Sequence, residues 1–125
     1  MLLKFQKKFA GWKKNTLSRA GRLTLIKSNI SGMPNHLMSC FKCPTNMINK
    51  MEALRRNFFW GSSSVDPIAW NDICKPKNKG GLGIRLFSCY NKAALSKLGW
   101  KILTDPNNLW VKIIKAKYLR NSSFF

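Results

Sequence analysis

Acidic residues are the scarcest chemical class in this 125-residue chain, with four against 23 lysines and arginines. They are Glu52, Asp66, Asp72 and Asp105. Metal-assisted phosphoryl transfer needs clustered carboxylates to hold its cations, and these four are scattered along the sequence. The nearest pair, Asp66 and Asp72, lies in an irregular stretch where nothing supports acid–base catalysis. Because no complete catalytic set can be assembled, we predict that the chain is not an enzyme and uses no cofactor.

Long apolar runs are also missing. No stretch of about 18 uncharged apolar residues occurs, so no transmembrane segment is predicted. The beginning of the chain lacks the apolar core of a secretory signal because Lys4, Lys7 and Lys8 interrupt it. A nuclear or cytoplasmic location is therefore expected in preference to secretion.

Metal-ligand clusters are sparse. Cys40 and Cys43 form a C-x-x-C pair, but a zinc site would need a second close pair, and Cys74 and Cys89 lie far apart. Cys40 falls on an apolar stripe, where a buried free thiol packs well. We therefore predict structural thiols and no metal site, with the single histidine, His36, at the surface or at a helix cap.

Positive charge is what the chain has in excess, with a formal net charge of +19. Such a body repels itself unless a polyanion neutralises it, and phosphate backbones do this by releasing counterions. An anionic membrane surface is the other common partner, and a solvated surface without a partner is the third interpretation. Basic residues gather around the second predicted helix and flank a glycine-rich stretch. The predicted nucleic-acid contacts, all to backbone phosphates, are Lys13, Lys14, Arg19, Arg22, Lys27, Lys79 and Arg85.

Apolar spacing predicts a mainly α chain of about five helices. A basic amphipathic helix covers 2–12, and a second follows the N-cap Ser18, with a break near residues 31–33 caused by Gly32 and Pro34. A third runs from Pro44 to Gly61, a fourth from the cap Ser88 to Asp105, and a fifth from Asn107 or Asn108. We expect one unit, 1–125, with helical parts 1–61 and 86–120 and an irregular part, 62–85. Short strands at 68–73 or 82–85 are compatible with this pattern.

The five tryptophans could stack bases, but four of them are predicted to be structural. The glycine-rich stretch from Lys79 to Arg85 lacks the Gly-Lys-Ser/Thr ending of a phosphate-binding loop. It predicts a tight turn that needs positive φ angles.

An ordered set of short motifs covers essentially the whole chain. The set consists of Trp12-Lys13, Leu17 to Arg22, Leu25 to Ser28, Met33-Pro34, Phe58 to Gly61, Ala69-Trp70, Cys74 to Lys77, Gly80 to Ile84, Asn91 to Leu95, Trp100, Leu109-Trp110 and Lys117-Tyr118. This set resembles plant LINE-type non-LTR retrotransposon reverse transcriptases, in the segment between the polymerase palm and the zinc-binding-like and ribonuclease H regions.

The resemblance implies a reverse transcriptase thumb or connector, a helical unit that lies against template and primer. The family's Tyr-x-Asp-Asp palm motif is absent, so its catalytic residues map to no position in this sequence. The chain is thus expected to be a non-catalytic fragment of an RNA-directed DNA polymerase that binds duplex or RNA/DNA hybrid, acting alone or with a full-length polymerase in trans. Two alternatives stay open. One is a cationic membrane-surface or organelle-imported protein led by residues 2–12, and the other is an inert, degenerate retroelement copy.

Overall fold

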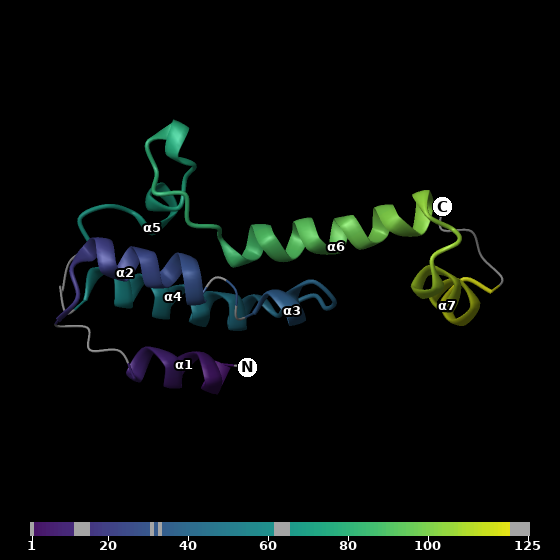
Figure 1. Ribbon diagram of the computed structural model, residues 1–125, viewed down its shortest axis with the longest axis horizontal. Helices are drawn as coiled ribbons and strands as arrows, with labels where there is room; N and C mark the ends of the chain where they lie inside the picture. The colour runs from purple at the N-terminus through teal and green to yellow at the C-terminus, as the bar shows by residue number, and fades with distance from the viewer. Residues whose placement is uncertain (1, 12–15, 31, 33, 62–65, 121–125) are drawn as a thin grey trace.

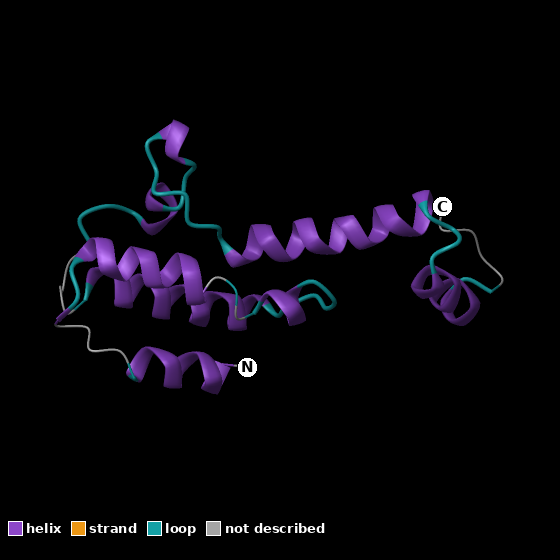
Figure 2. Cartoon of the chain, in the orientation of Figure 1, coloured by secondary structure: helices purple, strands orange, loops and turns teal. Residues whose placement is uncertain are grey.

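The computed structural model describes residues 2–11, 16–30, 32, 34–61 and 66–120, and this part of the chain is helical (Figures 1 and 2). The elements are α1 (Leu2–Ala10), α2 (Arg19–Leu25) continued by a π-helical turn (Ile26–Ile30), α3 (Asn35–Met38), α4 (Thr45–Trp60), α5 (Trp70–Ile73), a 3₁₀ turn (Lys77–Lys79), α6 (Phe87–Thr104) and α7 (Leu109–Tyr118). The predicted mainly α class is confirmed. The suggested short strands are wrong, because residues 70–73 form α5 and residues 82–85 are irregular.

Helix ends follow local sequence signals at most positions. The Ser18 hydroxyl accepts the N–H of Gly21 at 3.2 Å, and the Asn108 side chain accepts the N–H of Trp110 at 3.0 Å. Gly61, with φ +75°, ends α4. Of the predicted break between the second and third helical segments, residues 31 and 33 lie outside the described residues.

The predicted start of the fourth helix is wrong by two residues. Helix α6 begins at Phe87, and its N-cap is Leu86 and not the expected Ser88. The Phe87 N–H donates to Glu52 Oε1 at 2.8 Å, so a side chain from α4 satisfies the first turn in place of a local cap.

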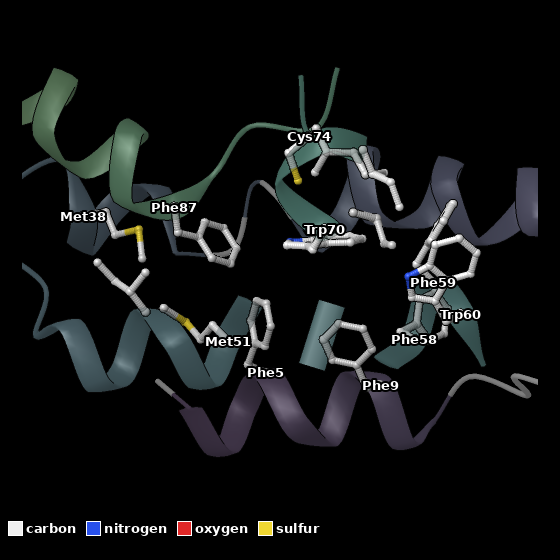
Figure 3. Close-up of a cluster of buried hydrophobic side chains, with 14 residues drawn as sticks. Phe5, Phe9, Met38, Met51, Phe58, Phe59, Trp60, Trp70, Cys74 and Phe87 are labelled. Atoms are coloured by element: carbon white, nitrogen blue, oxygen red, sulfur yellow. The ribbon is translucent and has the colours of Figure 1, made fainter. Parts of the chain in front are cut away.

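Aromatic side chains from four helices, α1, α4, α5 and α6, form the centre of the core (Figure 3). Phe5 and Phe9 on α1 point toward α4 and α6 and are 1% and 5% exposed. The Phe5 ring meets Phe87 edge-on at 5.9 Å between centroids, and the Phe9 ring meets Phe58 at 5.1 Å. Helix α1 is therefore an integral part of the core.

A buried ion pair joins α4 to α5 and α6. Glu52 Oε1 accepts from Arg55 Nη1 at 3.0 Å, and its Oε2 accepts from the Trp70 indole at 2.9 Å. Arg55 is fully buried, lies with its guanidinium 4.2 Å from the Phe87 ring centre, and donates to the Arg85 carbonyl at 3.0 Å. Burial lowers the pKa of Arg55, and the Glu52 charge opposes that shift. The pair thereby fixes the segment before α6 on α4.

A second polar link holds the turn after α3 against α6. The buried Asn91 amide donates to the carbonyls of Met38 and Phe41, at 2.6 and 2.8 Å, and its oxygen accepts the N–H of Cys43 at 3.0 Å. Three backbone groups that no helix satisfies are thus paired by one side chain.

The outer half of α6 extends beyond this core, and α7 lies at its far end (Figure 1). Trp100 on α6 is 66% exposed and Trp110 on α7 is 37% exposed. The prediction that four of the five tryptophans are structural leaves one exception, which Trp100 fits because its part of α6 extends beyond the core, while most of the Trp110 side chain is covered. It is confirmed for Trp60 and Trp70, which are buried, and Trp12 lies outside the described residues.

Candidate functional site

Two adjoining hollows lie beside the segment that precedes α6. The smaller, of about 300 Å³, separates the π-helical turn from that segment, and its lining includes Lys27, Asn35 and Arg85. The larger, of about 1040 Å³, follows α6, and its lining includes Lys75, Lys97 and Lys101. Both hollows are also lined by Gly83, Ile84, Arg85 and Tyr90. We call the two together the basic groove, whose cations are Lys27, Lys75, Arg85, Lys97 and Lys101.

Acids are missing from the lining of the basic groove among the residues that the structure describes. The nearest counter-charge is Asp72, whose carboxylate pairs with Lys75 at 2.6 Å between exposed side chains. Exposed pairs of this kind are weak and are screened by salt. The other four groove cations, Lys27, Arg85, Lys97 and Lys101, form no ion pair with the acids of the described residues.

The glycine-rich stretch shapes one wall of the groove. The N–H groups of Leu82 and Gly83 donate to the carbonyls of Ile73 and Lys75, at 2.7 and 2.9 Å. Gly81 lies so close to the Lys75 backbone that a Cβ there would clash with it. Gly80 and Gly83 have φ angles of +81° and +70°. The predicted tight turn is confirmed, and it brings Arg85 beside Lys27.

Of the seven predicted contacts, Lys27 and Arg85 meet in the groove. Lys79 is exposed on the 3₁₀ turn and does not line either hollow. Lys13 and Lys14 lie outside the described residues.

Arg19 and Arg22 instead lie at the C-terminal end of α4. Arg22 Nη1 donates to the Phe59 carbonyl at 3.3 Å, and the Arg19 guanidinium lies 5.2 Å from the Trp60 ring centre. A cation at this end of a helix satisfies its last carbonyls and complements the helix dipole. The exposed Arg19 and the half-buried Arg22 therefore both contact the end of α4.

Three groove cations were not among the predicted contacts. Lys97 and Lys101 are four residues apart on α6, the spacing that places two side chains on one helix face. That spacing was the available signal. No sequence pattern indicated that Lys75 lies in the groove, because its place depends on how the glycine-rich turn packs against the chain after α5.

Glu52, Asp66 and the buried Cys74 are engaged in contacts within the protein and do not form a second charged site. A third hollow, of about 890 Å³, includes Glu52 and Asp66 in its lining. Glu52 is occupied by three hydrogen bonds, and Asp66 pairs with Arg56 at 3.4 Å. Burial raises the pKa of the Cys74 thiol to about 12, which keeps it neutral in the core. Cys40, expected to be buried, is exposed in the turn that follows α3.

The described helices include none with the length and apolar character needed to cross a bilayer. The protein is thus strongly basic and helical, and no acidic side chain of the described residues lines its groove.

The sequence of this chain is similar to two plant proteins. It is 39% identical, over 122 residues, to an Arabidopsis thaliana protein provisionally named a ribonuclease H protein, a match that covers 94% of this chain and 20% of the relative.

It is also 30% identical, over 96 residues, to an uncharacterized mitochondrial protein of Arabidopsis thaliana, covering 73% of this chain and 62% of that relative. The chain therefore spans about a fifth of the first relative and about three fifths of the second. No protein-family model and no solved structure matches it. The two likenesses support a relation to plant retrotransposon proteins.

Proposed function

We propose that this chain is the thumb or connector part of a retroelement reverse transcriptase, without catalytic residues of its own, and that it binds nucleic-acid backbone along the basic groove. One observation carries the proposal. Five cations line two adjoining hollows, and no acid of the described chain lines either. In a protein of net charge +19, four of these five cations form no ion pair within the described chain, and only the exposed Lys75–Asp72 pair competes with a phosphate backbone in the groove.

Backbone binding has a definite thermodynamic signature. Each neutralised phosphate releases a condensed counterion, so the logarithm of the binding constant falls with the logarithm of salt concentration by about 0.9 per contact. Contacts to phosphates carry no sequence information. We therefore expect affinity for an RNA/DNA hybrid or a duplex that falls steeply with salt and hardly depends on sequence.

The test compares two variants of equal net charge. Replacing Arg85, Lys97 and Lys101 by Gln removes three groove cations, and replacing Lys4, Lys7 and Lys8 by Gln removes three exposed cations from α1. Fluorescence anisotropy with a labelled hybrid, between about 50 and 200 mM salt, gives the slope for each protein. The groove variant should reduce the slope by roughly two to three, and the α1 variant should change it little. Equal losses in both variants would mean that charge alone, and no groove, accounts for binding.

The alternative led by residues 2–12 is less favoured. Phe5 and Phe9, the apolar face of that segment, are buried against α4 and α6. With these two rings covered, α1 offers a membrane its lysines and the exposed Leu3, and its removal as a targeting segment would open the core.

A further inference from the structure

We infer that Trp100, which lies on α6 beside the groove cation Lys97, is a stacking platform for an unpaired base, so that this surface takes single-stranded nucleic acid as well as duplex. This inference rests on the proposed function, because it needs a phosphate backbone in the groove. It adds a ligand class, an unpaired strand, and a residue that recognises it.

The Trp100 ring is open to solvent. Its side chain is 66% exposed, and within the described part of the chain no ring or cation packs on it. Other aromatic residues differ. Phe59 and Trp60 meet edge-on at 5.0 Å, and the Lys117 amine lies 5.2 Å from the Tyr118 ring centre. Trp100 therefore presents a large, uncovered aromatic face, which is the surface that a base can use.

Trp100 does not line either hollow, but it lies on α6 next to lysines that do. Lys97, one helical turn before it, lines the larger hollow, and so does Lys101. Side chains three or four residues apart are neighbours on a helix surface, so Lys97 lies beside the tryptophan on α6. Lys97 and Lys101 stand one turn apart, about 5.4 Å along the axis. A strand whose phosphates contact these two lysines therefore brings its bases to the indole.

Charge and chemistry together select the occupant. The cations near Trp100 attract an anionic partner, and the exposed indole can stack on a partner that has a flat, apolar face. An unpaired nucleotide has both, and base–aromatic stacking tolerates every sequence because each base has a π face. In a duplex those faces are stacked on neighbouring pairs. Trp100 should therefore contribute to single-strand binding and not to duplex binding.

The experiment compares three variants of the full chain with the wild type. Trp100→Ala removes the ring, Trp100→Phe keeps an aromatic face, and Leu103→Ala removes a neighbouring exposed apolar side chain that cannot stack. The probes are an oligo-dT of about 15 nucleotides and a duplex of the same length, with helix content checked by circular dichroism. Trp100→Ala should weaken oligo-dT binding roughly 5- to 150-fold and leave duplex binding unchanged. Trp100→Phe should restore part of the loss, and Leu103→Ala should cause none.

Other results overturn the inference in distinguishable ways. Equal losses for Trp100→Ala and Leu103→Ala would make the site a general apolar contact. If both variants lose binding to phosphatidylserine vesicles while oligo-dT binding is unchanged, the surface is a membrane contact. If duplex binding is intact and Trp100→Ala leaves oligo-dT binding unchanged, the stacking site fails and the proposed function stands. If the wild type binds neither probe at low salt, the proposed function itself fails.

Discussion

Glu52, one of only four acids in this basic chain, links three helices through its carboxylate. Its carboxylate accepts hydrogen bonds from Arg55, the Trp70 indole and the Phe87 N–H, which belong to three different helices. Arg55, fully buried, has this carboxylate as its counter-charge. A buried pair is costly to form, and removing one partner leaves the other charge uncompensated.

We therefore predict that Glu52→Gln destabilises the protein by roughly 3–5 kcal/mol, measured by urea unfolding. Asp72→Asn is the matched control, because Asp72 and Lys75 form a pair with the same spacing of three residues but with both side chains 53% exposed. The control should cost at most about 1 kcal/mol. Similar costs for the two variants would show that the buried pair does not hold α5 and α6 on α4.

The cysteines should differ in reactivity. Burial, with a further contribution from the Glu52 charge, raises the pKa of Cys74 to about 12, whereas Cys40 and Cys89 are exposed. The thiolate is the reactive form, so at a pH of about 8.5 iodoacetamide should modify Cys40 and Cys89 and spare Cys74 until urea unfolds the chain. Mass spectrometry of peptides gives the extent at each site. Rapid modification of native Cys74 would contradict its placement in the core.

The sign of the pH dependence follows from the same shift. An unfolded thiol ionises near its ordinary pKa, while the native Cys74 keeps its proton to about pH 12. Between these values the unfolded state binds fewer protons than the native state, so Cys74 lowers the unfolding free energy as pH rises through that window. Below the ordinary pKa of the thiol, the contribution is constant.

The roles of single residues could be predicted from the sequence where the interacting partner lies nearby in the chain, and not where it lies far away. The N-caps Ser18 and Asn108 were predicted because their partners lie within three residues. The bridging role of Asn91 could not be predicted, because its backbone partners lie 48 to 53 residues earlier in the chain. The contacts of Arg19 and Arg22 with the end of α4 could not be predicted, because sequence alone does not show that α4 ends beside them.

At the scale of elements, the amphipathic pattern of the first helix is compatible with two different hypotheses about its role. Its stripe of Phe5 and Phe9 between lysines is typical both of a docking helix and of a membrane-surface segment. In the structure the stripe is buried in the core. Helix α3 lies where the apolar stripe of the predicted second helix continues after its break, whereas α5 escaped prediction because it is a single turn of four residues, too short to show a periodicity.

The buried stripe leads to a prediction about α1. Phe9→Ala should destabilise the protein by about 3–5 kcal/mol, because it removes a ring that packs edge-on against Phe5 and Phe58. Leu3→Ala, on the same helix and 73% exposed, should change the unfolding free energy by less than about 0.5 kcal/mol. Thermal and urea unfolding measure both. If Phe9→Ala has no effect, α1 is not part of the folded core, and that result would support the alternative in which residues 2–12 act as a targeting or membrane-surface segment.

At the scale of the whole molecule, buried side chains are unevenly distributed. The core cluster draws on α1, the π-helical turn, α3 to α5 and the first turn of α6, and partly buried leucines of α2 pack against it. Beyond it, among the described residues, Ile102 on α6 and Val111 on α7 are the buried apolar side chains. A helix of ten residues is too short to be stable in water without such packing.

We therefore propose that the outer end of the molecule opens separately from the core. In native-state hydrogen exchange, amides of α4 should exchange at the free energy of global unfolding, and amides of α7 should exchange through local openings of much lower free energy. Val111→Ala should reduce protection in α7 and leave α4 unchanged, because the side chain it shortens is fully buried and lies outside the core cluster. If α7 and α4 exchange at the same free energy and respond together to Val111→Ala, then the chain from α1 to α7 unfolds as one cooperative unit, and the exposed apolar residues of α6 and α7 belong to a structure as stable as the core.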